Sequence, residues 1–198
     1  MKPLSHSVRA ALRRKREGSV ITAESLSKLG TRSAIDQTLS RLAAKGEIMR
    51  IARGAYVVPR KGEFGSFPPS AERVVRSMAK RMRKPIVPDG GVAANRFGLT
   101  TQQPIRRVYL TSGRSSSLAL GSNPVELRHV PKWQTVLPGE PAGEAVRAMA
   151  YLGKEQAKEA ASRLKERLEP SQWEKLNRIA PKLPKWVGSA IAEVELRG

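Results

Sequence analysis

Three segments within the first fifty residues carry apolar residues at helical spacing. The clearest is SAIDQTLSRLAAKG, in which Ile35, Leu39 and Leu42 lie three and four residues apart and so fall on one face of a helix. The segments SVRAALRRK and AESLSKL contain shorter series of the same kind. The pattern predicts helices at residues 7–15, 23–29 and 33–46.

Residues that can cap a helix stand at the start of each segment. We expect Ser5 or Ser7 to cap the first helix and Thr22 to cap the second. Ser33 and Asp36 have the spacing of a capping box, in which each side chain accepts a hydrogen bond from the other residue's backbone N–H. The third helix is therefore expected to begin at Ser33, and Asp36 is excluded from any binding role.

The hydrophobic pattern changes after the third helix. EIMRIARGAYVVP predicts two strands around Ala52-Arg53-Gly54, where the glycine supplies the positive φ that a tight turn needs. Three helices followed by a hairpin within sixty residues is the order of a winged helix-turn-helix. The next segment, RKGEFGSFPPS, contains two Gly and two Pro and is interpreted as a linker. The predicted domains are residues 1–62 and 66–198.

The second predicted domain mixes helices with short strands. It begins with a helix at residues 71–82, and the runs RRVYLTS, SSLALG and VELRHV have high β propensity and predict a small antiparallel sheet. From residue 141 onward helical patterns dominate, and Pro141, Pro170 and Pro184 are placed to start helices. The predicted fold class is α+β, with a winged helix-turn-helix followed by a mixed domain with C-terminal helices.

The net charge of the chain is large and unevenly distributed, and it bears on the kind of partner. The chain has 37 Lys and Arg against 17 Asp and Glu, a formal net charge of +20. Residues 1–62 contribute +10, residues 63–138 contribute +8 and residues 139–198 contribute +2. A charge of this size favours a polyanionic partner. We therefore expect the contact surface in the first two segments.

The residue types that carry most enzyme chemistry are scarce. There is no cysteine, the two histidines His6 and His129 are far apart in the sequence, and Asp36 and Asp89 are the only aspartates. The chain also has no metal-ligand spacing and no nucleotide- or cofactor-binding motif. We therefore expect no enzymatic activity, no metal and no cofactor, and we set a nuclease aside.

The sequence also bears on the cellular compartment. No apolar run approaches the ~18 residues that a membrane span needs. The N-terminal stretch MKPLSHSVRAALRRKREG lacks the continuous apolar segment of a signal peptide. We expect a cytoplasmic protein without a membrane partner.

Candidate DNA-binding residues lie on the third helix and on the hairpin. With the apolar face toward the core, the opposite face is polar, and a helix of this kind fits the major groove. Gln37 can pair with adenine through two hydrogen bonds, and Arg41 can pair with guanine or hold a phosphate. Hydroxyl groups at the start of the helix and arginines beside the hairpin turn suit phosphate oxygens or a narrow minor groove. The predicted set is Thr31, Arg32, Ser33, Gln37, Ser40 and Arg41 with Arg50 and Arg53.

Three motifs make the chain resemble the AbiEi family, the antitoxin component of abortive-infection toxin–antitoxin systems. The motifs are LSRLAAKGEIMRIARGAYVVP, GGVAANRFGLTTQQP and VYLTSG. The resemblance implies a winged helix that represses its own operon at inverted repeats. It also implies a C-terminal domain that counteracts a nucleotidyltransferase-like toxin encoded beside it. Such systems are of type IV, in which antitoxin and toxin need not form a stable complex.

A second interpretation is a basic RNA- or ribosome-associated protein, because the charge supports it equally well. No RNA-recognition motif accompanies the charge. We therefore expect a transcriptional autorepressor that binds specific duplex DNA and acts as an antitoxin.

Overall fold

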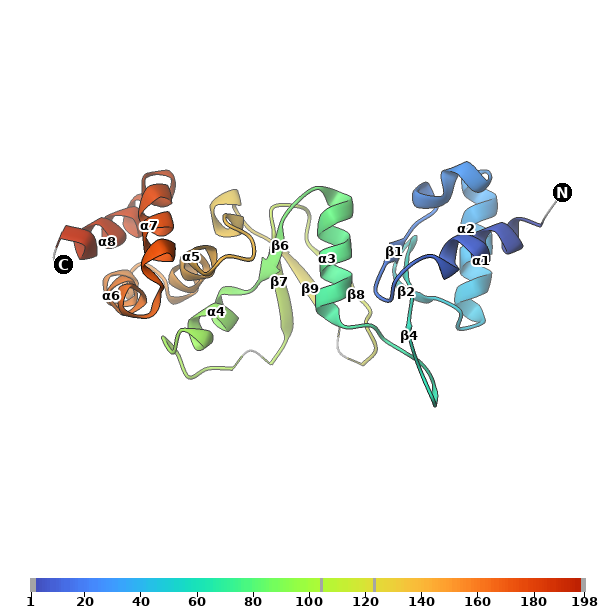
Figure 1. Ribbon diagram of the computed structural model, residues 1–198, viewed down its shortest axis with the longest axis horizontal. Helices are drawn as coiled ribbons and strands as arrows, with labels where there is room; N and C mark the ends of the chain where they lie inside the picture. The colour runs from blue at the N-terminus through green and yellow to red at the C-terminus, as the bar shows by residue number, and fades with distance from the viewer. Residues whose placement is uncertain (1–2, 104, 123, 197–198) are drawn as a thin grey trace. The chain divides into compact units, whose positions relative to one another are not determined.

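The computed structural model describes residues 3–103, 105–122 and 124–196 (Figure 1). The chain divides into two compact units. The first comprises Met1–Arg83 and Ser117–Val125, and the second comprises Lys84–Ser116 and Glu126–Gly198. Both units contain helices and small sheets, which confirms the α+β class. Pro104, the last residue of the GGVAANRFGLTTQQP motif, lies outside the described residues.

The first unit packs helices on a small sheet. Its three-stranded sheet has the order β1-β3-β2, with antiparallel pairing of β3 to both neighbours. Ile35 and Leu39, predicted to face the core, are fully buried among residues of the neighbouring helices. The helices are α1 (Leu4–Arg13), the 3₁₀ helix η1 (Glu24–Leu29), α2 (Arg32–Ala44) and α3 (Ala71–Met82). The strands are β1 (Val20–Ile21), β2 (Met49–Ala52), β3 (Ala55–Val57), β4 (Arg60–Gly62) and β5 (Gly65–Phe67).

The start of α2 differs from the sequence prediction. The N-cap is Thr31, whose hydroxyl accepts a hydrogen bond from the backbone N–H of Ala34 at 3.4 Å. The predicted capping box of Ser33 and Asp36 is wrong, because Ser33 already lies inside the helix. Asp36 instead faces Arg32 one turn away, with 3.9 Å between the carboxylate and Nε. The local choice between two neighbouring hydroxyl residues, both good caps, could not be made from sequence alone.

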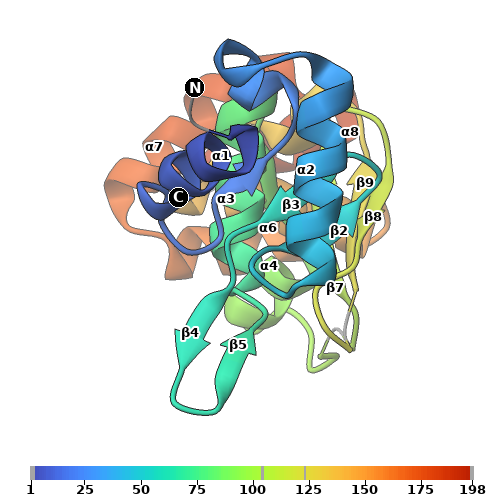
Figure 2. The same cartoon turned by 90° about the vertical axis from the view of Figure 1, so that its right-hand side faces the viewer.

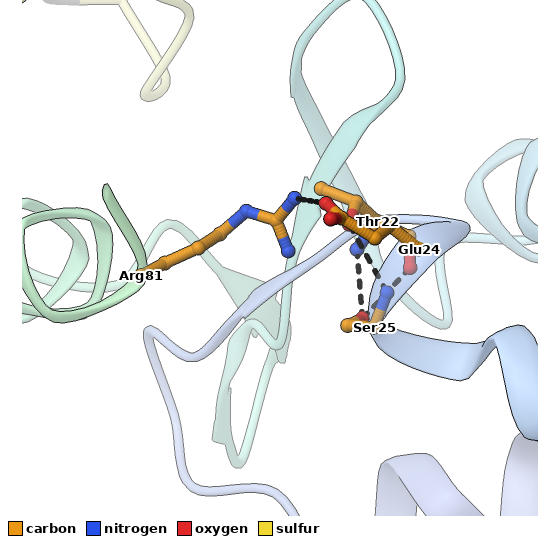
Figure 3. A network of polar contacts seen from close by, with 4 residues as sticks. All are labelled: Thr22, Glu24, Ser25 and Arg81. Carbon is orange, nitrogen blue, oxygen red and sulfur yellow. Dashed lines mark hydrogen bonds and ion pairs between the residues drawn. The ribbon is translucent and has the colours of Figure 1, made fainter. Parts of the chain in front are cut away.

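The N-caps of α1 and η1 also differ from the predicted residues. Pro3, not Ser5 or Ser7, precedes the first turn of α1 and provides no side-chain cap. The N-cap of η1 is Ala23 rather than the predicted Thr22, and it provides no side-chain cap. Thr22, one residue earlier, accepts a hydrogen bond from the backbone N–H of Ser25, and the Ser25 hydroxyl accepts one from the N–H of Thr22 (Figure 3). This reciprocal pair fixes the entry into η1.

The segment predicted to be a linker contains regular structure. Arg60 pairs with Phe67 and Gly62 with Gly65, so that β4 and β5 form an antiparallel hairpin. Every residue of both strands is exposed. The hairpin could not be predicted, because the glycines and prolines of this segment are equally typical of an unstructured linker.

Helix α3 belongs to the first unit, whereas the sequence analysis placed it in the second domain. The Ser77 hydroxyl accepts a hydrogen bond from the backbone N–H of Val20 in β1 at 2.9 Å. Arg73 forms an ion pair with Glu17 at 3.1 Å, and Arg81 forms another with Glu24 (Figure 3). These contacts attach α3 to β1, to the residues just before β1 and to the start of η1.

The second unit joins a sheet to a cluster of helices. The sheet has the order β6-β7-β9-β8, and β6 is antiparallel to β7. Its strands are β6 (Ile86–Pro88), β7 (Arg107–Thr111), β8 (Ser116–Leu118) and β9 (Val125–His129), of which residues 117, 118 and 125 belong to the first unit. The helices are α4 (Gly90–Arg96), η2 (Lys132–Thr135), α5 (Pro141–Leu152), α6 (Ala157–Arg167), α7 (Pro170–Ile179), η3 (Ala180–Lys182) and α8 (Lys185–Leu196). Pro141 and Pro170 occupy the first turns of their helices, as predicted, and Pro184 directly precedes α8.

A buried cation lies on one helix of the second unit. Arg147 on α5 is 1% exposed, and its Nη1 donates a hydrogen bond to the carbonyl oxygen of Val136 at 3.3 Å. Its Nε is buried and has no hydrogen-bond partner. Burial lowers the pKa of Arg147 to about 10, while nearby Glu144 opposes that shift. The guanidinium is therefore a cost to the stability of this unit.

Among the residues described here, none forms a helix both long and apolar enough to span a bilayer.

Candidate nucleic-acid interface

All eight candidate residues are exposed in the structure. Those on α2 lie opposite Ile35, Leu39 and Leu42, which are buried as predicted. Thr31 and Arg32 are at the start of the helix, and Ser33, Gln37 and Ser40 follow along its outer face. The amphipathic pattern of α2 therefore leaves a polar helix face open to a partner.

Four of the candidates surround a single hollow, the α2–β2 hollow. Arg32 and Ser40 contribute from α2, while Arg50 and Arg53 contribute from β2 and the turn that follows it. Gly54 completes this turn with φ of +67°, the left-handed conformation predicted for it. The turn thus holds Arg53 at the tip of the β2–β3 hairpin.

Three charged residues of the α2–β2 hollow were not among the candidates. Glu24 enters from η1, Asp36 from α2 and Arg81 from α3. Glu24 and Arg81 form the ion pair drawn in Figure 3. Arg81 lies in the helix predicted at residues 71–82. Nothing in the spacing of α3 indicates that its last turn approaches η1.

Arg41 faces a different hollow, on the other side of α2. It lies there with Ser5 and Arg9 of α1 and with Lys45 just beyond the end of α2. The outer face of α2 is therefore flanked by cations on both sides, Arg32, Arg50 and Arg53 on one and Arg9, Arg41 and Lys45 on the other.

Carboxylates neutralise these flanks only in part. Asp36 faces Arg32, and Glu24 is paired with Arg81. Within the described part of the chain, no carboxylate forms an ion pair with Arg50 or Arg53. These two guanidinium groups are available for phosphate oxygens, which they can bind through two parallel hydrogen bonds.

Ligands for a metal ion do not gather in the described residues, which contain no group of three or more His, Asp and Glu side chains suited to one. His129 is engaged within the second unit, where its Nδ1 lies 2.7 Å from the carbonyl oxygen of Gly113.

Comparison with known protein families gives one match. Residues 7–176 match the model of a family described as "Family of unknown function (DUF6088)". The match spans most of both units. No curated protein matches the chain, and no solved structure does.

Proposed function

We propose that this chain, which belongs to the DUF6088 family, binds specific duplex DNA through an N-terminal winged helix-turn-helix and represses transcription. The elements run in the order α1, β1, η1, α2, β2 and β3. In a winged helix this order makes α2 the recognition helix and the β2–β3 hairpin the wing. The recognition helix enters the major groove, and the wing contacts the flanking backbone.

The observation that carries the proposal is the α2–β2 hollow. It places the exposed face of α2 beside Arg50 and Arg53 of the hairpin, which have no ion-pair partner among the described residues. Gln37 and Ser33 stand on the helix face, where amide and hydroxyl groups can contact base edges or phosphates. A helix that presents neutral polar groups between two cationic flanks is complementary to a groove between two phosphate backbones.

Gel-shift titration of the full chain against the DNA upstream of its own gene tests the proposal. We expect a retarded complex that a random duplex displaces only at much higher concentration, because base contacts add to the phosphate contacts that all sequences share. Competition by single-stranded or structured RNA is the control. Preferential binding to RNA would favour an RNA- or ribosome-associated protein and contradict the proposal.

The antitoxin role is a second part of the proposal, and the motif resemblance to AbiEi antitoxins supports it. We assign the repressor activity to the first unit and the antitoxin activity to the second. The C-terminal sixty residues, with 11 basic and nine acidic residues, are close to charge balance. A surface of this kind is better suited to protein contacts than to a polyanion.

Growth of cells that express a neighbouring nucleotidyltransferase-like gene tests the antitoxin role. Co-expression of the full chain is expected to restore growth, and so is a variant with Arg50→Ala and Arg53→Ala, because DNA binding is not needed for protection. Loss of protection in that variant would contradict the assignment of the two activities to separate units.

A further inference from the structure

A second basic surface lies on the first unit, in the α1–β4 cleft. Its walls come from α1, from the residues that follow α1 and α2, and from the β4–β5 hairpin. The cations that line it are Arg9, Arg13, Lys15, Lys45, Arg60 and Lys61. The only carboxylates among the lining residues are those of Glu17 and Glu47.

Both carboxylates of the α1–β4 cleft are already engaged. Glu47 accepts two hydrogen bonds from Arg9, at 2.8 and 2.7 Å, and these bonds hold the pKa of Glu47 below its ordinary value. Glu17 is paired with Arg73 of α3 at 3.1 Å. Lys15, Lys45 and Lys61 are exposed, and no carboxylate of the described residues forms an ion pair with them. The cleft therefore keeps a surplus of positive charge directed at solvent.

The α1–β4 cleft is continuous with the flank of α2 that holds Arg41. Arg9 and Lys45 line both the cleft and the hollow around Arg41. A strip of cations thus runs from the outer face of α2, past the end of that helix, to the β4–β5 hairpin. A partner with regularly spaced negative charges could contact the whole strip.

The tip of the β4–β5 hairpin carries an exposed aromatic ring. Figure 2 shows the hairpin extending away from α1 and α2. Phe64 at its tip is 91% exposed, and the guanidinium of Arg60 lies 5.7 Å from the ring centre of Phe67 at its base. Phe64 follows Glu63 at the tip of a hairpin whose first strand begins with Arg60 and Lys61, so the ring is exposed close to the cations of the cleft. DNA-bending proteins insert side chains of this kind between base pairs in the minor groove.

We propose that the α1–β4 cleft binds the phosphate backbone of duplex DNA beside the groove that α2 enters, and that Phe64 inserts into the adjacent minor groove. The inference rests on the proposed function, because it takes duplex DNA as the partner. It extends the contact surface of α2 and the β2–β3 hairpin to the β4–β5 hairpin, and it shares Arg9 and Lys45 with the flank of α2 that holds Arg41. It also makes this chain a protein that bends its target.

Two variants test the two parts of the inference in the full chain. Replacing Lys15, Lys45 and Lys61 by Gln is expected to reduce the slope of log affinity against log salt by about 2–3, because each lost phosphate contact removes about 0.9. Phe64→Ala is expected to leave that slope unchanged and to reduce bending, measured as energy transfer between dyes at the two ends of a short duplex. All four positions are exposed, so the variants should melt at the temperature of the unmodified protein.

Matched controls come from exposed residues of the second unit. Replacing Lys154, Lys182 and Lys185 by Gln removes the same charge and is expected to leave the slope within error of the unmodified chain. Ile105→Ala removes a fully exposed apolar side chain and is expected to leave bending unchanged.

The outcomes separate this inference from the proposed function. Binding of the upstream DNA with a slope and bend that neither test variant changes would overturn the inference and leave the proposed function standing. Failure of the unmodified chain to bind any duplex would overturn both. Vesicles that contain phosphatidylserine serve as the competing probe, and binding to them that Phe64→Ala abolishes would reassign the hairpin to a membrane surface and overturn the inference.

Discussion

The first unit and the C-terminal helices use a similar density of cations in different ways. The first unit has 19 Lys and Arg in 92 residues, and residues 139–198 have 11 in 60, which is about one residue in five in both. The difference lies in the carboxylates, of which the first unit has six and the C-terminal segment nine. The net charges are +13 and +2.

The C-terminal helices match their cations with carboxylates of neighbouring elements. Lys158 on α6 pairs with Glu193 on α8 at 2.9 Å, and Lys175 on α7 pairs with Glu140 before α5 at 2.6 Å. In the first unit the ion pairs Arg73–Glu17 and Arg81–Glu24 attach α3, and most remaining cations face solvent. The comparison teaches that the number of carboxylates, rather than the number of cations, distinguishes a self-contained helical cluster from a surface that is available to a polyanion.

The salt dependence of DNA binding is the largest effect that follows. With about six phosphate contacts from the first unit, log affinity should fall with log salt at a slope of roughly −5, a loss of about a thousandfold between 50 and 200 mM salt. Fluorescence anisotropy with a labelled duplex measures this slope. A slope near zero would show that the surplus cations of the first unit do not contact phosphates. The difference in charge between the first unit and the C-terminal helices would then have no bearing on DNA binding.

Within the first unit, we expect Gln37 to contact bases and Arg53 to contact the phosphate backbone. Gln37→Ala should weaken the specific complex by about 1–3 kcal/mol and change the affinity for random DNA much less. Arg53→Ala should weaken both complexes alike, because a guanidinium at the hairpin tip contacts phosphate. Parallel titrations of the two variants on both duplexes measure this. Equal losses on both duplexes for Gln37→Ala would assign that residue to the backbone as well.

Arg147 differs from the exposed cations of the first unit, because it is buried within the second unit and cannot contact a partner. Its folded pKa of about 10 is below the ordinary value, so the folded state binds its proton less tightly than the unfolded state. The cost that the charge of Arg147 adds near neutral pH should consequently be relieved only above about pH 10, where the folded state releases this proton before the unfolded state does.

Replacing that charge by an apolar side chain of similar length should remove the cost. Arg147→Met is expected to raise the free energy of unfolding by about 1–2 kcal/mol, whereas Arg147→Ala should lower it by leaving a cavity. Thermal denaturation followed by circular dichroism measures both. A lower melting temperature for Arg147→Met would indicate that the bond to the Val136 carbonyl outweighs the burial of charge.

The smallest effect concerns the cap of α2. Thr31→Ala should cost about 0.5–1 kcal/mol of stability, because the N–H of Ala34 loses its side-chain acceptor. Ser33→Ala is the matched control and should change stability by less than about 0.5 kcal/mol, since Ser33 lies inside the helix and is exposed. Denaturant unfolding of both variants decides which hydroxyl group caps α2. A larger loss for Ser33→Ala would restore the capping box predicted from the sequence.

Most of the correct predictions came from the spacing of apolar residues along the chain. The burial of Ile35 and Leu39, the helix at Ala71–Met82 and the β2–β3 turn at Gly54 follow from the spacing of apolar residues and from one glycine. These features depend on neighbours in the sequence, so a single chain contains the information. The exposure of Gln37, Ser40 and Ser33 on α2 follows from the same periodicity.

Contacts between distant segments could not be predicted in this way. Spacing alone does not show that Arg81 reaches Glu24 or that Ser77 binds the backbone of β1. The same limit hid the α1–β4 cleft, which brings together residues from α1, from the end of α2 and from the β4–β5 hairpin. Arg41 was assigned to the face of Gln37 by the helical period, but only the position of α1 shows which hollow it enters.

The return of residues 117–125 to the first unit has a consequence for synthesis of the chain. The backbone N–H of Ala119 donates a hydrogen bond to the carbonyl oxygen of Ile51 at 2.8 Å. After Arg83 has left the ribosome exit tunnel, another 42 residues must follow before Val125, the last residue of this unit, also emerges. At about 5–20 residues per second this takes about 2–8 s, during which Ile51 is without its later partner. The nascent first unit is thus exposed to chaperones and proteases in an unfinished form for seconds.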